Sequence, residues 1–162
     1  MKFKARFTTI LLMTLLFGCD NSSKMNTTET KYYNSGKLKS QVNFFNKKRN
    51  GVAVFFYENG NVERLENYIN DTINGEIFHF YPNGILEKKF IMALGKINGL
   101  AYSFYPSGNL MQYRKYVNDR KEGTAEDFWE NGVLKAAYLL QNDTIKLKDS
   151  YDSSGIMIDK WR

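Results

Sequence analysis

The chain of 162 residues is 43% hydrophobic and 15% aromatic, contains two prolines, and carries a formal net charge of +6. This length and composition indicate one folded domain rich in β-structure and exclude a disordered chain. Lys2, Lys4 and Arg6 are three of the 23 basic residues, and the remaining 20 nearly balance the 17 acidic residues. We therefore expect an ordinary mixed surface and no nucleic-acid partner.

The N-terminal segment has the features of a secretory signal peptide, which we place at residues 1–18. Its basic residues precede an apolar run from Phe7 to Phe17. A helix that spans a bilayer needs ~20 apolar residues, so this run is too short, whereas signal peptides have an apolar region of this length. The alternative, a buried core helix, would need polar positions at helical spacing, and only three threonines interrupt the run.

The end of this segment predicts a lipid anchor. Leu16-Phe17-Gly18-Cys19 resembles the lipobox of bacterial lipoproteins, in which the cysteine is lipidated. Cys19 is the only cysteine and cannot form an intramolecular disulfide, so the alternative is an incidental free thiol. Because two or more acyl chains anchor a protein stably, we expect an exported, membrane-anchored lipoprotein of the bacterial cell envelope. Residues 19–31 are mostly small and polar, and they are predicted to form a flexible tether.

The strongest feature of the remaining sequence is a repeat of 24 residues. Two sets of glycines recur at this spacing, and an aromatic residue precedes each glycine of the first set by three positions. The first set is Gly36, Gly60, Gly84, Gly108 and Gly132; the second is Gly51, Gly75, Gly99 and Gly123; the aromatic residues are Tyr33, Tyr57, Tyr81, Tyr105 and Trp129. Such a period is typical of repeat proteins in which each unit contacts only its neighbours.

Each unit contains two predicted strands and two tight turns. The first strand follows the turn glycine, as in Val62 to Ile69, and a loop rich in Asn, Asp and Gly follows at 70–75. The second strand, as in Val52 to Tyr57, leads to a turn in which Gly60 supplies a positive φ. Residues 32–162 are therefore predicted to be all-β: an elongated antiparallel β-meander of about five 24-residue two-stranded repeats. Residues 146–162 are predicted to form a degenerate cap that protects the last sheet edge.

Aromatic columns are predicted to hold the units together. Phenylalanines end the second strands and directly precede the Tyr/Trp column, at Phe56, Phe80, Phe104 and Phe128. Since successive side chains of a strand point to opposite faces, we expect the two columns on opposite faces, with rings stacked from unit to unit. Tyr57, Tyr81, Tyr105 and Trp129 have a second interpretation, a partly exposed ladder that binds a peptide, glycan or lipid surface.

The recurring phrases "YENGNV", "YPNGIL" and "NGEIFHFYPNG" resemble the MORN-repeat-variant family, which includes bacterial proteins described as YwqK-type antitoxins. The resemblance covers roughly residues 32–156. It implies an elongated antiparallel sheet used in binding or scaffolding, with no cofactor and no established catalytic residues. The antitoxin description implies neutralisation of a toxin by direct contact.

Catalytic and metal-binding patterns are weak. His79 is the only histidine, and its column is occupied by Phe55, Ser103 and Asp127 in other units, so we interpret it as a structural or surface residue. No His/Cys cluster suits zinc, and the Asn-Asp-Thr turns at 70–72 and 142–144 lack the dense carboxylates of a calcium loop. Acidic residues in the fourth and fifth units could suit a glycoside hydrolase: Glu122, Glu126, Asp127 and Glu130. We predict no catalytic residues, no metal and no cofactor.

Three functional hypotheses follow. The leading one is a lipid-anchored envelope protein that binds a protein or polymer partner, without catalysis. The alternative is an antitoxin or immunity protein that sequesters a toxin, and it rests on the family resemblance. The third is a hydrolase that uses the carboxylates of residues 122–130.

Overall fold

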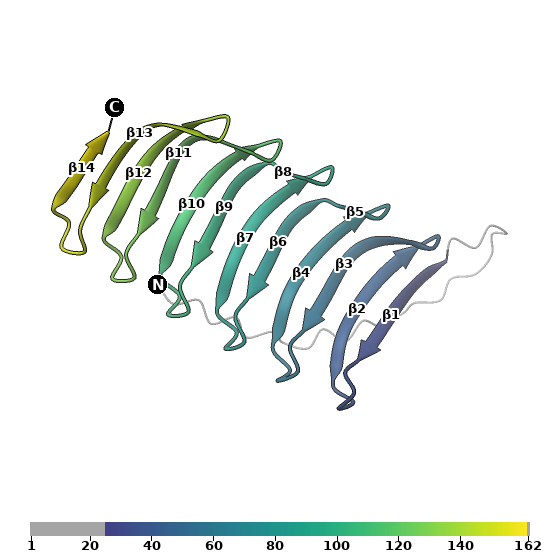
Figure 1. Cartoon of the computed structure of the whole chain (residues 1–162). Helices are drawn as coiled ribbons and strands as arrows, with labels where there is room; N and C mark the ends of the chain where they lie inside the picture. The colour runs from purple at the N-terminus through teal and green to yellow at the C-terminus, as the bar shows by residue number, and fades with distance from the viewer. Residues whose placement is uncertain (1–24, 162) are drawn as a thin grey trace.

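A computed structural model describes residues 25–161, which form one open antiparallel sheet of 14 strands (Figure 1). The strands follow one another in chain order as a meander, and the two-residue strands β5 and β8 pair beside β4 and β7. Their bounds are β1 Asn26–Tyr32, β2 Leu38–Phe45, β3 Lys48–Phe56, β4 Val62–Ile69, β5 Thr72–Ile73, β6 Gly75–Phe80, β7 Leu86–Ala93, β8 Lys96–Ile97, β9 Gly99–Phe104, β10 Leu110–Val117, β11 Arg120–Phe128, β12 Leu134–Gln141, β13 Thr144–Tyr151 and β14 Met157–Trp161. The predicted all-β meander is confirmed.

The predicted turn glycines close one side of the sheet. All five adopt a positive φ between 81° and 92°, the region in which a side chain is disfavoured. In the turn at residues 57–61, the amide of Gly60 donates to the carbonyl of Tyr57 at 2.9 Å, and the amide of Tyr57 donates to the carbonyl of Asn61 at 2.8 Å. The same pair of hydrogen bonds recurs in each later unit, so the sequence repeat is also a repeat of turn geometry.

The turns on the other side are shorter than the predicted loops. Two residues of positive φ form each of them: Asn46-Lys47, Asn70-Asp71, Leu94-Gly95, Asn118-Asp119 and Asn142-Asp143. Two successive positive φ values are those of a type I′ turn, whose twist matches that of the flanking strands. The second glycine set lies after these turns, and near Gly51 the pairing of β2 with β3 shifts between Val42 and Phe44. These glycines therefore occupy β-bulges, where positive φ lets the strand resume pairing.

One row of directly paired residues crosses the whole sheet, and we call it the central row. It contains one residue from each of the twelve long strands: Lys31, Ser40, Phe55, Arg64, His79, Lys88, Ser103, Gln112, Asp127, Ala136, Ser150 and Asp159. Because side chains alternate along a strand, this row defines one face of the sheet, which we call the row face.

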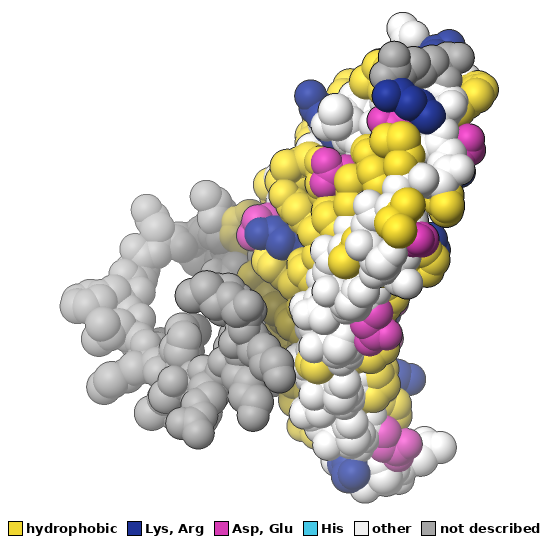
Figure 2. Space-filling model, turned by 90° about the vertical axis from the view of Figure 1, so that its left-hand side faces the viewer, with side chains coloured by type: hydrophobic (Ala, Val, Ile, Leu, Met, Phe, Trp, Pro, Cys, Tyr) yellow, Lys and Arg dark blue, Asp and Glu magenta, His cyan; other side chains and the backbone are white. Residues whose placement is uncertain are grey.

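The sparse core lies on the row face. Ala53, Ile77 and Ala125 are 0 to 2% exposed and stand two residues before members of the central row, so they share its face. Tyr68 and Leu140 are also buried there, opposite Gly51 and Gly123. The other face carries exposed aliphatic side chains: Val52, Ile91, Leu100 and Leu139. Seen from the β14 side, hydrophobic side chains (yellow) reach the surface, with charged side chains between them (Figure 2).

The N-terminal boundary differs from the prediction. Residues 26–31, expected in the flexible tether, form most of β1, which pairs with β2 from Asn26 to Tyr32. All seven residues of β1 are exposed, so neither face supplies the apolar alternation by which a strand is recognised. Backbone pairing and a hydrogen bond from the Thr28 hydroxyl to Asn43 Oδ1 (2.8 Å) hold this strand instead.

The C-terminal segment continues the meander. Residues 152–156 form another turn of the glycine type, with Gly155 at φ 90° and its amide donating to the carbonyl of Asp152 at 3.0 Å. β13 and β14 then pair as the earlier hairpins do, and the sheet ends at β14. The predicted cap region is thus two further strands, of which β14 is itself the exposed edge.

Candidate binding face

Charged and aromatic side chains form a cluster at the N-terminal part of the row face. The guanidinium of Arg64 lies over the ring of Phe55, 3.7 Å from its centroid, and its Nε is 2.9 Å from a carboxylate oxygen of Glu66. Within residues 25–161, the buried Nε of Arg64 has this ion pair but no hydrogen-bond partner. The hydroxyl of Tyr68 donates to the other oxygen of Glu66 at 2.6 Å, and Arg49 lies over the Tyr68 ring. Burial, followed by the hydrogen bond to Glu66, raises the pKa of Tyr68 to about 12.

A second cluster of the same kind lies further along the row face. Arg114 forms an ion pair with Asp127 and donates to the carbonyls of Tyr113 and Glu126 at 2.8 and 2.9 Å. The other oxygen of Asp127 accepts a hydrogen bond from the hydroxyl of Tyr138 at 2.8 Å. Burial, followed by this hydrogen bond, raises the pKa of Tyr138 to about 12. Arg114 is therefore held rigidly and its charge is balanced.

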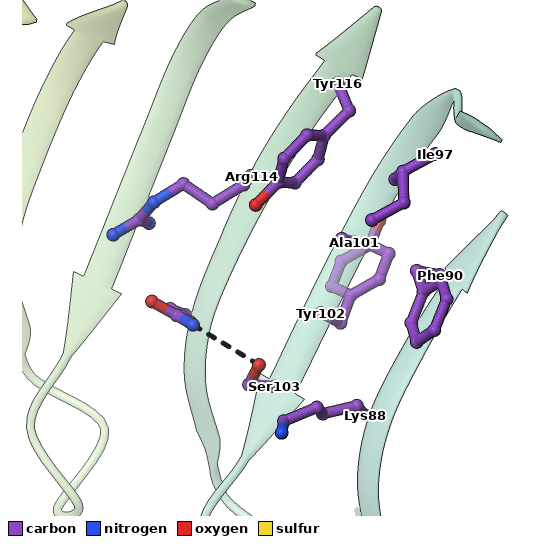
Figure 3. A pocket seen from close by; sticks show the side chains of 9 residues that line it. Lys88, Phe90, Ile97, Ala101, Tyr102, Ser103, Arg114 and Tyr116 are labelled. Carbon is purple, nitrogen blue, oxygen red and sulfur yellow. Dashed lines mark hydrogen bonds between the residues drawn. The ribbon is translucent and has the colours of Figure 1, made fainter. Parts of the chain in front are cut away.

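A hollow of about 240 Å³ lies on the row face between β7, β9 and β10 (Figure 3). Its polar members include Lys88, Ser103 and Gln112, and the amide of Gln112 donates to the Ser103 hydroxyl at 3.3 Å. Phe90, Ala101, Arg114 and Tyr116 lie around them. Ser103 and Gln112 replace the larger Phe55 and Arg64 of the earlier unit, which explains why the surface is hollow here.

The hollow combines aromatic walls with hydrogen-bonding groups and an accessible cation. The side chain of Lys88 is 48% exposed, and its one ion pair within residues 25–161 is with Glu87, on the same strand, at 3.2 Å. Binding sites generally pair apolar walls with a few convergent polar groups. The chemistry of this site therefore suits a polar segment of a peptide or glycan that carries negative charge.

His79 lies in the central row between Arg64 and Lys88. Burial lowers its pKa, and the two cations lower it further. Its ring packs edge-on against Phe90, with centroids 5.7 Å apart. These contacts agree with the structural role predicted for this residue.

The predicted aromatic binding residues tie successive repeats together. The hydroxyl of Tyr57 donates to the carbonyl of Phe80 at 2.7 Å, and Tyr33, Tyr81 and Tyr105 make the corresponding bonds. Trp129 donates from its indole nitrogen to the carbonyl of Tyr151 at 3.1 Å. A role of Tyr57, Tyr81, Tyr105 and Trp129 in binding a partner stays a prediction.

The expected ring stacking in this column does not occur within residues 25–161. Equivalent residues of adjacent units are two strands apart, ~9.6 Å, whereas stacked rings lie ~4.5–7 Å apart. A tyrosine hydroxyl can span this distance to the neighbouring carbonyl, whereas the ring cannot reach its counterpart. The repeat period is confirmed, but the contact that it encodes is a hydrogen bond.

Two further columns that tie the repeats were not identified from the sequence. On the glycine-turn side, the amides of Asn61 and Asn109 donate to the carbonyls of Pro82 and Glu130 at 2.7 and 2.8 Å. On the other side, aspartates accept from a backbone amide of the preceding unit: Asp71 from Arg49, Asp119 from Ile97 and Asp143 from Lys121. Positions 71, 95, 119 and 143 follow the 24-residue period, and all except Gly95 are aspartates. This regularity could have revealed the aspartate column from the sequence.

The carboxylates considered for hydrolysis are not brought together as a pair. Glu126 and Asp127 are adjacent in β11 and point to opposite faces. Asp127 is bound by Arg114 and Tyr138, and Glu122 accepts from the amide of Asn142. In residues 25–161, no group of three or more His, Cys, Asp or Glu side chains is arranged to hold a metal ion.

Cys19 lies outside the described residues, as do the predicted signal peptide and the first part of the tether. Over the portion that the structure covers, no helix has the length and apolar character needed to cross a membrane.

Comparison with known proteins gives one informative match. No curated protein matches the chain. Among solved structures, a mutant of S. aureus TarM in complex with fondaparinux, alpha-GlcNAc-glycerol and UDP is similar at 12% identity and a TM-score of 0.40. That match covers 73% of this chain and 20% of the TarM chain. The family model for the MORN repeat variant matches residues 25–46, 49–70, 73–91, 97–118 and 121–142, which are more than half of the chain. The chain therefore belongs to the MORN repeat variant family.

Proposed function

We propose that this protein is a non-catalytic binding module that presents the row face to an extended protein or polymer partner. The observation that carries the proposal is the hollow at Lys88, Ser103 and Gln112, where Ser103 and Gln112 stand in place of the larger Phe55 and Arg64. The Arg64 cluster lies on the N-terminal side of the hollow and the Arg114 cluster on its C-terminal side. An extended partner on the row face would therefore meet fixed charges and aromatic rings on both sides of the hollow. Membership in a repeat family also favours binding over catalysis.

Lys88 and Lys89 provide a matched test of this proposal. They are adjacent in β7 and both basic, but Lys88 lies on the row face and Lys89 on the other face, where it pairs with Glu76 at 2.6 Å. Reversing the charge at Lys88 places a carboxylate in the hollow and opposes an anionic partner, whereas the same change at Lys89 leaves the hollow intact.

The experiment is in-cell crosslinking followed by capture of the protein as the wild type, the Lys88→Glu variant and the Lys89→Glu variant. We expect a partner that crosslinks to the wild type and to Lys89→Glu, and that is lost with Lys88→Glu. Equal capture by both variants, or loss with Lys89→Glu alone, would contradict binding at the row face. Thermal unfolding of each variant checks that the sheet is intact.

We further propose that the module is held at the bacterial cell envelope by a lipid on Cys19. The lipobox-like segment and the absence of any other cysteine support this attachment. Cys19→Ser should abolish incorporation of labelled fatty acid and move the protein out of the membrane fraction. Retained lipid labelling would refute the anchor and leave the binding proposal standing.

The antitoxin alternative rests on the family resemblance. A sequestered toxin would make the gene essential only in the presence of its toxic partner. Deleting the gene with and without its genomic neighbours tests this, and viable single deletions without a toxicity phenotype would exclude the alternative.

A further inference from the structure

Within residues 25–161, the end strands β1 and β14 each pair on one side only, and the chemistry of the two strands differs. β1 is polar and carries Glu29 and Lys31, which form an ion pair at 2.9 Å. The β14 edge exposes apolar side chains at Ile156, Met157, Ile158 and Trp161, which are 46 to 67% exposed. Unpaired strand edges are templates for pairing with another chain, and an apolar edge is the stronger template. The β14 edge is therefore suited to pairing with a further strand.

The repeat specifies which strand fits beside β14. Across the sheet, strands that follow a glycine turn alternate with strands that precede a glycine turn. β14 follows such a turn, and β1 precedes one. Inside the sheet, strands of these two kinds pair from unit to unit as β4 does with β6, with Arg64 opposite His79. Asp159 holds the place of Arg64 in the central row, and Lys31 holds that of His79. Continuing the row beyond β14 therefore puts Lys31 of a second copy opposite Asp159.

We propose that copies of this chain join head to tail, with β14 of one copy pairing antiparallel with β1 of the next and Lys31 opposite Asp159. The join has three favourable features: the register continues the repeat, the opposed charges are complementary, and the apolar edge is covered by backbone pairing. Because the two surfaces differ, the contact is heterologous and leaves a free β1 and a free β14 at the ends. Assembly is therefore open and extends the central row from copy to copy.

Pairing of β14 with itself is disfavoured by charge when the two-fold axis lies at Asp159 or Lys160, whereas an axis at Ile158 avoids like charges but leaves β1 uncovered. A two-fold arrangement centred on Asp159 places two carboxylates opposite each other, and one centred on Lys160 does so with two ammonium groups. Pairing of β1 with itself, with Glu29 opposite Lys31, avoids this repulsion but leaves the apolar β14 edge uncovered. That arrangement is a distinct outcome of the test below.

The terminal turn sets the strength of the join. Within the chain, each unit is tied to the next by a hydroxyl such as that of Tyr33, which donates to the carbonyl of Phe56. In the last turn the equivalent residue is Asp152, whose carboxylate accepts from Ser154 and Ile156 and donates nothing outward. The carbonyl equivalent to that of Phe56 in the next copy belongs to Tyr32. The join therefore depends on strand pairing alone, and we expect it to form reversibly with rising concentration.

Disulfide trapping tests the register. Directly opposed residues of antiparallel strands have Cα atoms ~4.5–5.5 Å apart, within the range of a disulfide. In the full chain carrying Cys19→Ser, Lys31→Cys together with Asp159→Cys should give a ladder of oxidised multimers on a non-reducing gel. The matched control, Thr30→Cys with Asp159→Cys, places the thiols on opposite faces and should give none. Absence of the ladder, or dimers from either single-cysteine chain, would overturn the proposal, the latter by showing two-fold pairing.

Charge reversal and the terminal turn give an independent readout by sedimentation velocity. Asp159→Lys and Lys31→Asp should each weaken association about twofold to fivefold, and the double variant should restore it. Asp152→Tyr should strengthen association because it supplies the missing hydroxyl. Both reversed residues are exposed, so the folded state should be unaffected. A double variant as weak as the singles, or an Asp152→Tyr chain that associates no better than the wild type, would contradict the register.

Discussion

At the scale of the residue, the hydroxyl groups of the tyrosine column, and not their rings, connect one repeat to the next. Each hydroxyl donates a hydrogen bond to a backbone carbonyl of the next unit, and that carbonyl belongs to the residue directly before the next glycine turn. A hydrogen bond of this kind contributes ~0.5–1.5 kcal/mol to stability. Since the same bond recurs along the sheet, the column fixes the spacing of the units as well as their stability.

Tyr81→Phe should destabilise the protein by ~0.5–1.5 kcal/mol, because it removes the hydroxyl that donates to the carbonyl of Phe104 at 2.8 Å while keeping the ring. Tyr32→Phe is the control, since its side chain is 62% exposed on β1. Urea denaturation measures both. Equal stability of the Tyr81 variant and the control would show that the hydroxyl bond contributes nothing.

Two tyrosines of the row face with raised pKa values predict a loss of stability in alkali. Burial and a hydrogen bond to a carboxylate raise the pKa of Tyr68 and of Tyr138 to about 12 in the folded protein, whereas an unfolded tyrosine has a pKa of about 10. Their raised pKa values give stability that is complete below pH 10 and is lost as the pH rises from 10 to 12. The melting temperature should therefore fall over that interval, and it should fall less in the Tyr68→Phe, Tyr138→Phe double variant. If the melting temperature of the double variant fell as steeply as that of the Tyr32→Phe control, the raised pKa values would not be the cause of the alkaline loss of stability.

At the scale of the element, the glycine turns are the points at which the chain tolerates least change. Gly84 has a φ of 81°, and a Cβ added there would meet only the Asn61 side chain at 4.0 Å. The obstacle to substitution is thus backbone conformation and not lack of space. This distinction makes the effect of a side chain at Gly84 predictable from its shape.

Gly84→Val should destabilise the protein by roughly 1–2 kcal/mol, because a β-branched side chain is disfavoured at positive φ. Gly84→Asn is the matched control: it also adds a side chain, but asparagine tolerates the left-handed region, so its loss should be smaller. Thermal unfolding distinguishes them. Equal losses for the two variants would mean that side-chain volume, and not φ, decides the outcome.

The elements that the sequence predicted are those whose residues repeat. The 24-residue columns predicted the meander and the five glycine turns, because the same glycine recurs at the same positive-φ position of each unit. β1 was missed because its exposed residues carry no apolar pattern. The hollow was also missed, because it arises at Ser103 and Gln112, where the residues differ from those of other units. The repeat pattern predicts only the positions that stay the same from unit to unit. The Tyr/Trp column was recognised, but its hydrogen bonds depend on a strand-to-strand distance that sequence spacing does not reveal.

At the scale of the whole molecule, the single sheet formed by residues 25–161 is stabilised mainly by contacts between neighbouring units. Buried side chains are few and lie along the row face, and the turns of one unit bind those of the next on both sides of the sheet. Such a protein is approximately a sum of units and of the contacts between them. Its length should therefore be adjustable in whole units, but not in half units.

Deleting residues 85–108 tests this directly. The deletion removes 24 residues and joins Gly84 to Asn109, so the turn at Tyr81 keeps its sequence pattern, and Phe128 takes the place of Phe104 as acceptor of the Tyr81 hydroxyl. We expect a shorter sheet that still unfolds cooperatively. Deleting residues 85–96 is the matched control: it removes one long strand, so every later turn moves to the opposite side of the sheet and the hydroxyl, Asn and Asp contacts lose their partners. Circular dichroism with thermal unfolding should therefore show native-like melting only for the whole-unit deletion. Equal behaviour of the two deletions would mean that strand pairing alone holds the sheet, and that the ties between turns, on which the phase of the repeat depends, contribute little.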